Sequence, residues 1–276
     1  MLGASFARHR RFMIGEFEVT TLLAGTTPRD NPQGIFGTNV PVEEFNAVSE
    51  AHFLSTTSSQ FFFTPTLVNT GKELVLFDTG LNAEGTGAAI AAAGYTPDQV
   101  DVVVLTHMHG DHIGGLLTDG APTFANARYV AGQVEFDHWA AQGNDRFEAN
   151  VRPVAEMMSF LGDGDDVVSG ITGMAAFGHT PGHMVFRLDS AGAGLVIFAD
   201  LANHPVWSLA RPEWEVRFDA DKEMAAQSRR NILGMIAADR IPAIGYHMPF
   251  PAVGYVAQGT DGAAFQWVPE GGQLMG

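Results

Sequence analysis

Four side chains that can bind a metal ion are crowded into one short stretch. The sequence "LTHMHGDHIGG" (105–115) contains His107, His109, Asp111 and His112. Imidazole and carboxylate groups suit zinc and its first-row neighbours. Because His107 and His109 are two residues apart, a turning backbone can aim both at one ion. Asp111 and His112 follow at once and could face a second ion beside it.

The residues before this stretch predict the element that positions it. The run "VVVLT" (102–106) is β-branched and apolar, which is typical of a buried strand. The histidines then lie in the loop that leaves the carboxyl end of the strand, where α/β folds usually bind ligands. Gly114 and Gly115 would let the backbone turn tightly beneath the ions.

The rest of the chain predicts strands interleaved with helices, which indicates an α/β or layered α+β architecture. Strands are expected at 17–25, 64–71, 73–80, 100–107, 127–132, 194–200 and 241–247. Helices are expected at 85–95, 134–142, 152–162 and 221–240, the last with Asp221 as its N-cap. Proline, glycine and aromatic residues predict long loops at 26–45 and 203–219. With 276 residues, we expect one elaborated domain, 1–276.

Composition narrows the possible partners. The net charge of −16 would repel a nucleic acid, so we expect a small-molecule substrate instead. Cysteine is absent, so a transition-metal site must use histidine and carboxylate. No run reaches the roughly 18 apolar residues that a membrane helix needs. Glu16 and Glu18 follow the basic "ARHRR" segment, which favours a first strand over a signal peptide and predicts a cytoplasmic protein.

The stretch 105–115, one motif before it and three motifs after it resemble motifs of the metallo-β-lactamase superfamily. "THMHGDHIGG" is similar to the superfamily's signature, and three motifs follow in the family's order: "GHTPGH" to His183, "LVIFAD" to Asp200 and "AIGYH" to His247. Upstream, "LVLFDTG" is similar to the family's first motif. The resemblance implies an αβ/βα sandwich, in which two mixed β-sheets pack face to face with helices outside.

The resemblance also implies a centre of two divalent metal ions. It divides the ligands as follows: His107, His109 and His183 on one ion, Asp111, His112 and His247 on the other, and Asp200 bridging both. Asp78 and His179 are implied to orient ligands without binding metal. Zinc is the expected ion, although iron, manganese and cobalt accept the same ligands.

Such a centre predicts hydrolysis. Two ions about 3.5 to 4 Å apart can lower the pKa of a bridging water, so that hydroxide attacks a polarised carbonyl or phosphoryl group. Asp200 would hold the two ions together, and Asp111 could orient the hydroxide or return a proton. The serine motif GxSxG is absent, which agrees with a hydroxide nucleophile.

Within the superfamily, the chain is most similar to methyl parathion hydrolase and its relatives. The similar segments include "AAAGYTPDQVDVVVLTHMHGDHIGGL", "EVRFDAD" and "HMPFPAVGYV". This resemblance implies hydrolysis of an ester, lactone or phosphotriester of a mostly apolar molecule. Phe136, Trp139 and Phe250 are the candidate pocket residues, whereas Phe61 to Phe63 are expected in the core. Ala199 departs from the family, where a glycine commonly precedes the bridging aspartate, and 26–59 has no match.

Other functions stay open. An N-acyl homoserine lactonase uses the same ligand set, and it is the nearest alternative. A glyoxalase II-like thioester hydrolase fits less well, because no basic residue follows Arg240. A metal-binding redox or sensor protein would use the same fold without hydrolysis. The resemblance also suggests a homodimer.

Overall fold

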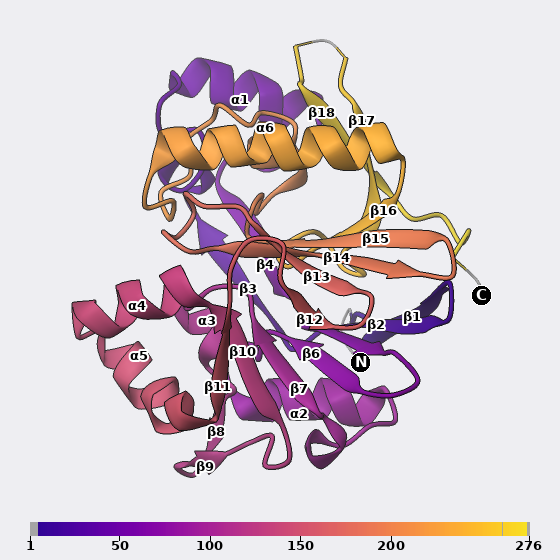
Figure 1. Ribbon diagram of the computed structural model, residues 1–276. Helices are drawn as coiled ribbons and strands as arrows, with labels where there is room; N and C mark the ends of the chain where they lie inside the picture. Colours follow the sequence, from indigo (N-terminus) through magenta and orange to yellow (C-terminus); the bar gives the residue numbers. More distant parts are fainter. Residues whose placement is uncertain (1–4, 261, 275–276) are drawn as a thin grey trace.

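The computed structural model describes residues 5–260 and 262–274, and its centre is a pair of seven-stranded sheets. Figure 1 shows the two sheets packed against each other with helices outside them. Apolar side chains fill the interface, among them Val68 and Val104 from the first sheet and Phe186 and Ile244 from the second. The predicted αβ/βα sandwich is therefore confirmed.

The first sheet has the strand order β1-β2-β5-β6-β7-β10-β11. The strands are β1 (His9–Ile14), β2 (Phe17–Leu22), β5 (Thr66–Asn69), β6 (Leu74–Phe77), β7 (Val102–Leu105), β10 (Arg128–Gly132) and β11 (Met158–Leu161). Strands β6, β7, β10 and β11 run parallel. All four residues of β7 are buried, as the sequence predicts for this strand. The loop with His107 and His109 follows its carboxyl end.

The second sheet has the order β12-β13-β14-β15-β16-β17-β18. The strands are β12 (Asp166–Val168), β13 (Ile171–Ala175), β14 (Met184–Ser190), β15 (Ala193–Ala199), β16 (Pro242–Gly245), β17 (Val253–Gln258) and β18 (Phe265–Pro269). Strands β15 and β16 are parallel, so their carboxyl ends meet at the same edge. Short pairs are formed by β3 (Gly25–Asp30) with β4 (Ser58–Phe63), and by β8 (Leu117–Thr118) with β9 (Ala121–Pro122).

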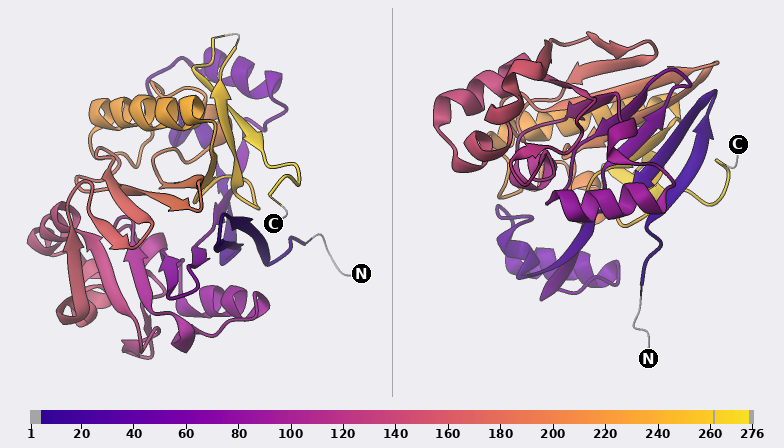
Figure 2. Two further views of the ribbon diagram at one scale, coloured as in Figure 1. Left: turned by 45° about the vertical axis from the view of Figure 1, so that its right-hand side comes forward. Right: turned by 90° about the horizontal axis from the view of Figure 1, so that it is seen from below.

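Helices cover both outer faces. The helices are α1 (Val42–Ala51), α2 (Ala83–Ala92), α3 (Gly110–Ile113), α4 (Gln133–Gln142), α5 (Asp145–Asn150) and α6 (Lys222–Asp239). Helix α6 lies across the second sheet in Figures 1 and 2. Its residues Leu233 and Ile236 belong to the core cluster formed with that sheet. Asp221 caps it as predicted, since its carboxylate accepts from Met224 N at 2.9 Å. Helix α2 packs Ile90 against the first sheet.

Two segments differ from expectation. The predicted helix at 152–162 is a short 3₁₀ turn, Arg152–Met157, followed by strand β11. Residues 158–161 instead pair with β10 as the edge strand of the first sheet, and this pairing outweighs the helical preference of the local sequence. The predicted loop at 26–45 holds most of β3 and the start of α1, whose Phe45 packs on Trp207 and Trp214. In the predicted loop 203–219, Pro205–Leu209 forms a π-helical turn.

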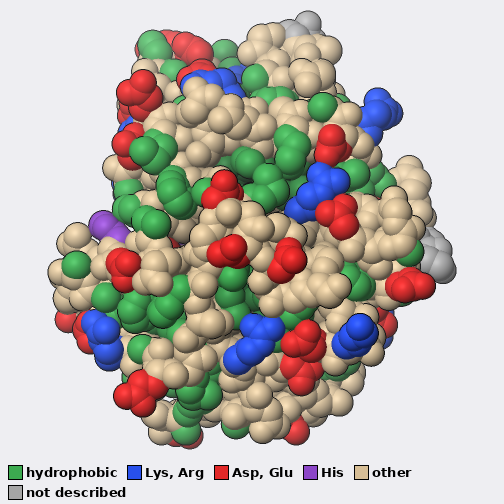
Figure 3. Space-filling model, in the orientation of Figure 1, with side chains coloured by type: hydrophobic (Ala, Val, Ile, Leu, Met, Phe, Trp, Pro, Cys, Tyr) green, Lys and Arg blue, Asp and Glu red, His purple; other side chains and the backbone are tan. Residues whose placement is uncertain are grey.

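The surface agrees with the acidic composition. On the face seen in Figure 3, acidic side chains are scattered among hydrophobic ones, and basic side chains stand singly without forming a stripe. No helix in the described part of the chain has the length and apolar character to span a bilayer.

Candidate metal centre

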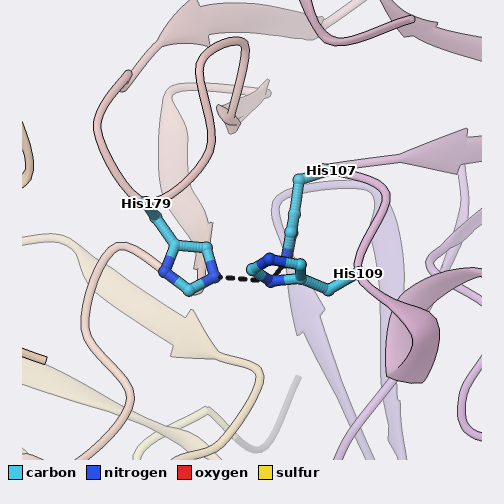
Figure 4. Close-up of side chains that lie close together, drawn as sticks. All are labelled: His107, His109 and His179. Atoms are coloured by element: carbon cyan, nitrogen blue, oxygen red, sulfur yellow. Dashed lines mark hydrogen bonds between the residues drawn. The ribbon is translucent and has the colours of Figure 1, made fainter. Parts of the chain in front are cut away.

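The metal-binding side chains meet where the central strands of both sheets end. His107 and His109 leave β7 and precede the short helix α3, while Asp200 follows β15 and His247 follows β16. His179 comes from the loop before β14, and Figure 4 shows its ring turned toward His107 and His109 from the opposite side. Side chains from four separate segments of the chain therefore converge at one edge of the sandwich.

Three histidines form the first cluster. His109 Nδ1 lies 3.1 Å from His107 Nε2 and 3.0 Å from His179 Nε2. One nitrogen from each ring lies within 4.8 Å of the others, which is close enough to share one ion. His107 and His179 are buried, so their rings are held by the surrounding chain.

Asp111, His112 and His247 form the second cluster. Asp111 Oδ2 lies 3.3 Å from His247 Nε2 and 3.8 Å from His112 Nε2. These three residues also offer ligand atoms within 4.8 Å of one another. The structure thus brings together the three residues that the resemblance puts on one ion.

The carboxylate of Asp200 lies between the two clusters. Its Oδ2 lies 3.3 Å from His179 Nε2 and 3.2 Å from His247 Nε2, while Oδ1 lies 3.3 Å from His112 Nε2. Ala199 before it has a φ of 47°, a left-handed conformation that favours glycine. This conformation turns the chain as β15 ends, and it explains why a glycine suits the position.

His183, which the resemblance puts on the first ion, is not in the group of three histidines whose nitrogens lie within 4.8 Å of one another. Its Nδ1 lies 3.2 Å from the carbonyl oxygen of Ala176, and its Nε2 accepts from Asp200 N at 3.2 Å. Burial lowers the pKa of His183 to about 3, so the ring is neutral and can accept that bond. His183 thus contacts the backbone of Asp200, and His179 is the third histidine of the first cluster. The assignment of His183 as a metal ligand stays a prediction.

A buried carboxylate and a buried arginine hold His179 from behind. Asp219 Oδ1 lies 2.9 Å from His179 Nδ1, and Arg229 Nη1 donates to Asp219 Oδ2 at 2.8 Å. Arg229 also donates to the carbonyl of Pro212, so α6 anchors the whole arrangement. Histidine ligands commonly donate their second N–H to a carboxylate in this way. The sequence did not predict either role, although Asp219 lies in the "EVRFDAD" motif.

Asp78 contacts the far side of His112, as the sequence predicts. Its Oδ2 lies 2.8 Å from His112 Nδ1, and the same carboxylate accepts from the backbone and hydroxyl of Thr106, each at 2.9 Å. His247 is held in a similar way, because its Nδ1 donates to the carbonyl of Phe62 at 2.7 Å. Each of these rings therefore turns its other nitrogen toward the cluster.

Glu135 joins the two loops that carry the first cluster. This buried carboxylate accepts from Met108 N and from Trp139 Nε1 through Oε1, and from Thr180 Oγ1 and Gly182 N through Oε2, at 2.7 to 2.9 Å. A Cβ at Gly182 would lie 2.1 Å from the backbone nitrogen of Glu135, so only glycine permits the approach. Glu135 escaped sequence analysis because a single glutamate on a helix usually faces solvent.

The electrostatics of the centre fit positive ions. His112 Nε2 and Asp200 Oδ1 are buried, and neither has a hydrogen-bond partner among the described residues. Burial lowers the pKa of His247, but Asp200 and Asp111 outweigh it and raise that pKa to about 9. Burial also lowers the pKa of His179, but the carboxylates of Asp200 and Asp219 outweigh burial and raise that pKa to about 9. The carboxylates thus require positive charge beside them, and two divalent cations fit this donor set.

A cavity of about 300 Å³ opens onto the centre. Asp111, Asp200, His109, His179 and His247 face it from the metal-binding side. Its other walls are apolar or cationic, and they comprise Phe61, Phe63, Leu81, Phe218, Arg29 and Arg146. The rings of Phe61 and Phe63 stand edge-on to His247, each 5.4 Å away between centroids.

The predicted pocket residues lie elsewhere. Phe136, Trp139 and Phe250 are not among the residues that line this cavity. Helix α4 turns Phe136 toward the buried Phe147 and the half-buried Phe160. The ring of Trp139 lies next to that of His109, with ring centroids 5.8 Å apart. Phe250 lies in the turn after β16. Phe61 to Phe63 on strand β4 are buried, as expected. Phe61 and Phe63 belong to a core cluster and also form part of the cavity wall.

Comparison with known proteins gives consistent matches. The family model of the metallo-beta-lactamase superfamily matches residues 64–243. N-acyl homoserine lactonase of Bacillus cereus is 27% identical over 149 residues, which are 53% of this chain and 55% of the relative. The matched region thus spans about half the length of the curated relatives.

Solved structures match over nearly the whole chain. One is AidC, a dizinc quorum-quenching lactonase in complex with its product, with a TM-score of 0.86 and 24% identity over 95% of this chain and 97% of AidC. Another is the hydrolase AbOPH of the beta lactamase superfamily, with a TM-score of 0.84 and 26% identity over 97% of this chain and 99% of AbOPH.

Proposed function

Because the chain belongs to the metallo-beta-lactamase superfamily, we propose that it is a metal-dependent hydrolase that opens lactones of the N-acyl homoserine class. The curated relatives with this name support the choice of lactones over phosphotriesters. The observation that carries the proposal is the double His/Asp cluster at the base of an apolar-walled cavity. This ranking reverses the one reached from sequence, where the methyl parathion hydrolase-like activity came first.

We propose the following ligands for two divalent ions, with zinc as the first choice. One ion is held by His107, His109 and His179, the other by Asp111, His112 and His247, and Asp200 joins the two. When bound, such ions lower the pKa of water and polarise the bond under attack. A dizinc centre in a lactonase of the same fold supports zinc.

The two carboxylates at the centre would have different roles. The side chain of Asp200 is 5% exposed and that of Asp111 is 25% exposed, so Asp111 is the more accessible of the two to a bound substrate. Asp111 can therefore return a proton to the leaving alcohol, whereas Asp200 is placed to hold ligands together. The hydroxyl of Tyr246 donates to the backbone carbonyl of Asp111 at 2.5 Å and fixes this segment.

The cavity walls suit the acyl part of a lactone or ester. Phe61 and Phe63 come from one face of β4 and present apolar rings beside His247. Pockets of this kind bind ligands through apolar walls and a few placed polar groups. The same aromatic walls favour a second candidate activity, the hydrolysis of aryl esters or organophosphates.

A comparison of kcat/KM tests the proposed function. Zinc-loaded protein is assayed with N-hexanoyl homoserine lactone, a 4-nitrophenyl ester and an aryl phosphotriester. We expect the lactone to exceed the other two by about 100-fold or more, because a site built for one substrate discriminates by this order. A phosphotriester that exceeds the lactone would overturn the lactonase assignment. Zinc-loaded protein that is inert on all three would overturn hydrolysis itself.

Two further expectations stay predictions. We propose that residues 1–276 form one domain, which the apolar interface shared by both sheets supports. The homodimer and the cytoplasmic location are predictions from sequence that still await their own experiments.

A further inference from the structure

Two arginines line the cavity above the metal-binding residues. Arg29 lies near the end of β3 and Arg146 in the first turn of α5, and both are exposed. Within the described residues, neither guanidinium group has a hydrogen-bond or ion-pair partner. The chain has only 15 basic residues against 31 acidic ones. Two unpaired basic side chains at one small cavity are therefore unexpected and point to a role in binding.

Arg146 lies directly on the metal-binding loop. A Cβ at Gly110 would lie 2.3 Å from Arg146 Nη1 and 2.7 Å from Arg146 Cδ. Gly110 separates His109 of the first cluster from Asp111 of the second. The guanidinium group therefore packs across the loop at the point where a substrate would meet both clusters.

Several other arginines of the chain pair with carboxylates. Arg152 pairs with Glu148 at 2.9 Å, and Arg187 pairs with Asp239 at 2.7 Å. Arg229 pairs with Asp219 inside the protein. Arg29 and Arg146 instead keep their donors open beside a cavity, where a guanidinium group can bind a carboxylate through two parallel hydrogen bonds.

We propose that Arg29 and Arg146 bind a carboxylate of the substrate, so that the site selects lactones or esters that carry this group. The inference rests on the proposed hydrolytic function and goes beyond it: N-acyl homoserine lactones are neutral, so among lactones and esters it predicts faster hydrolysis of those that carry a carboxylate. Phe61, Phe63, Leu81 and Phe218 would contact the apolar part, which makes the preferred substrate amphipathic and not simply apolar. Two divalent ions outweigh Asp111 and Asp200 in charge, so the loaded cavity would attract anions despite the acidic chain.

Matched substrates test this inference. One pair is 4-nitrophenyl valerate and mono-4-nitrophenyl glutarate, in which a terminal methyl group is replaced by a carboxylate. A second pair is a γ-lactone with a methyl group or a carboxylate at the γ-carbon. The readout is the ratio of kcat/KM for the anionic substrate to kcat/KM for the neutral one, measured with zinc-loaded protein. Because each ratio compares two substrates of one preparation, differences in folded fraction cancel.

In the wild type we expect a ratio of about 10 or more at low salt, since hydrogen bonds between charged groups are the strong ones. Arg146→Gln and Arg29→Gln should each lower it by about tenfold. Arg146→Lys should restore part of the ratio, because it keeps the charge without the planar fork. Sodium chloride should lower the wild-type ratio, because salt screens exposed charges.

Arg152→Gln is the matched control. Arg152 is an exposed arginine that pairs with Glu148 and does not line the cavity, so this variant should keep the wild-type ratio. A ratio near 1 in the wild type that stays unchanged in the Arg29 and Arg146 variants overturns the inference, while hydrolysis itself stands. Zinc-loaded protein that hydrolyses neither pair instead overturns the proposed function.

Discussion

Replacing Asp200 with alanine is expected to lower kcat/KM for lactone opening by more than about 100-fold. Loss of a residue that only supports a ligand commonly costs about 10- to 100-fold in affinity or activity. Asp200 has a more direct position, since its carboxylate lies 3.2 to 3.3 Å from His112, His179 and His247. Without it, three buried rings lose their shared negative charge, and we expect fewer than two zinc ions per chain.

The measurement combines zinc content with steady-state kinetics. Asp189→Ala is the matched control, because Asp189 is an exposed aspartate on β14 that pairs with Arg187. This control should retain two ions and wild-type turnover. Near-wild-type turnover of Asp200→Ala at full zinc occupancy would refute the assignment of Asp200 as the residue that joins two ions.

Exchanging His179 for alanine is expected to weaken zinc binding at one site and to lower kcat/KM by about 100-fold or more. His179 Nε2 is 3.0 Å from His109 Nδ1 and faces the cavity, so its loss removes a proposed ligand. His183→Ala should keep both ions, because both ring nitrogens of His183 contact the backbone. That variant should instead lose stability by about 1 to 3 kcal/mol, since Asp200 N is left without its acceptor.

Zinc titration and thermal unfolding of the zinc-free forms separate these outcomes. His52→Ala serves as the control, because His52 is exposed and belongs to neither cluster. Loss of one zinc ion in His183→Ala, together with two tightly bound ions in His179→Ala, would restore the ligand set that the resemblance implies.

The sequence predicts the metal-binding loop well because the information is local. Four candidate ligands lie within six positions directly after a buried strand, so the backbone cannot place them far apart in space. They are His107, His109, Asp111 and His112. Asp200 and His247 were also expected, because the motifs that they end, "LVIFAD" and "AIGYH", follow in the order that the family resemblance implies. The alternation of strands and helices indicates only an α/β or layered α+β architecture, and the sandwich is what the family resemblance implies.

The choice between His179 and His183 could not be made from sequence. Both belong to "GHTPGH", and both are buried in the structure. Only the path of the loop decides which ring faces the clusters and which binds the backbone of Asp200. Spacing within a turn rich in glycine and proline does not determine that path.

The supporting carboxylates were missed for a related reason. Glu135 and Asp219 are single acidic residues in a chain with 31, and most acidic side chains are solvated. Their partners come from distant segments, such as Thr180 for Glu135 and Arg229 for Asp219. The pocket aromatics were misplaced because residue type shows apolar character but does not show which face of α4 meets the core.

Zinc titration of metal-free protein, followed by lactone-opening activity, tests the central claim most directly. The two clusters share Asp200, so we predict that activity is absent without metal, rises with added zinc and levels off at two ions per chain. Removal of zinc by a chelator should abolish activity, and two equivalents should restore it. Full lactone hydrolysis without metal, or no hydrolysis with two ions bound, would contradict the account.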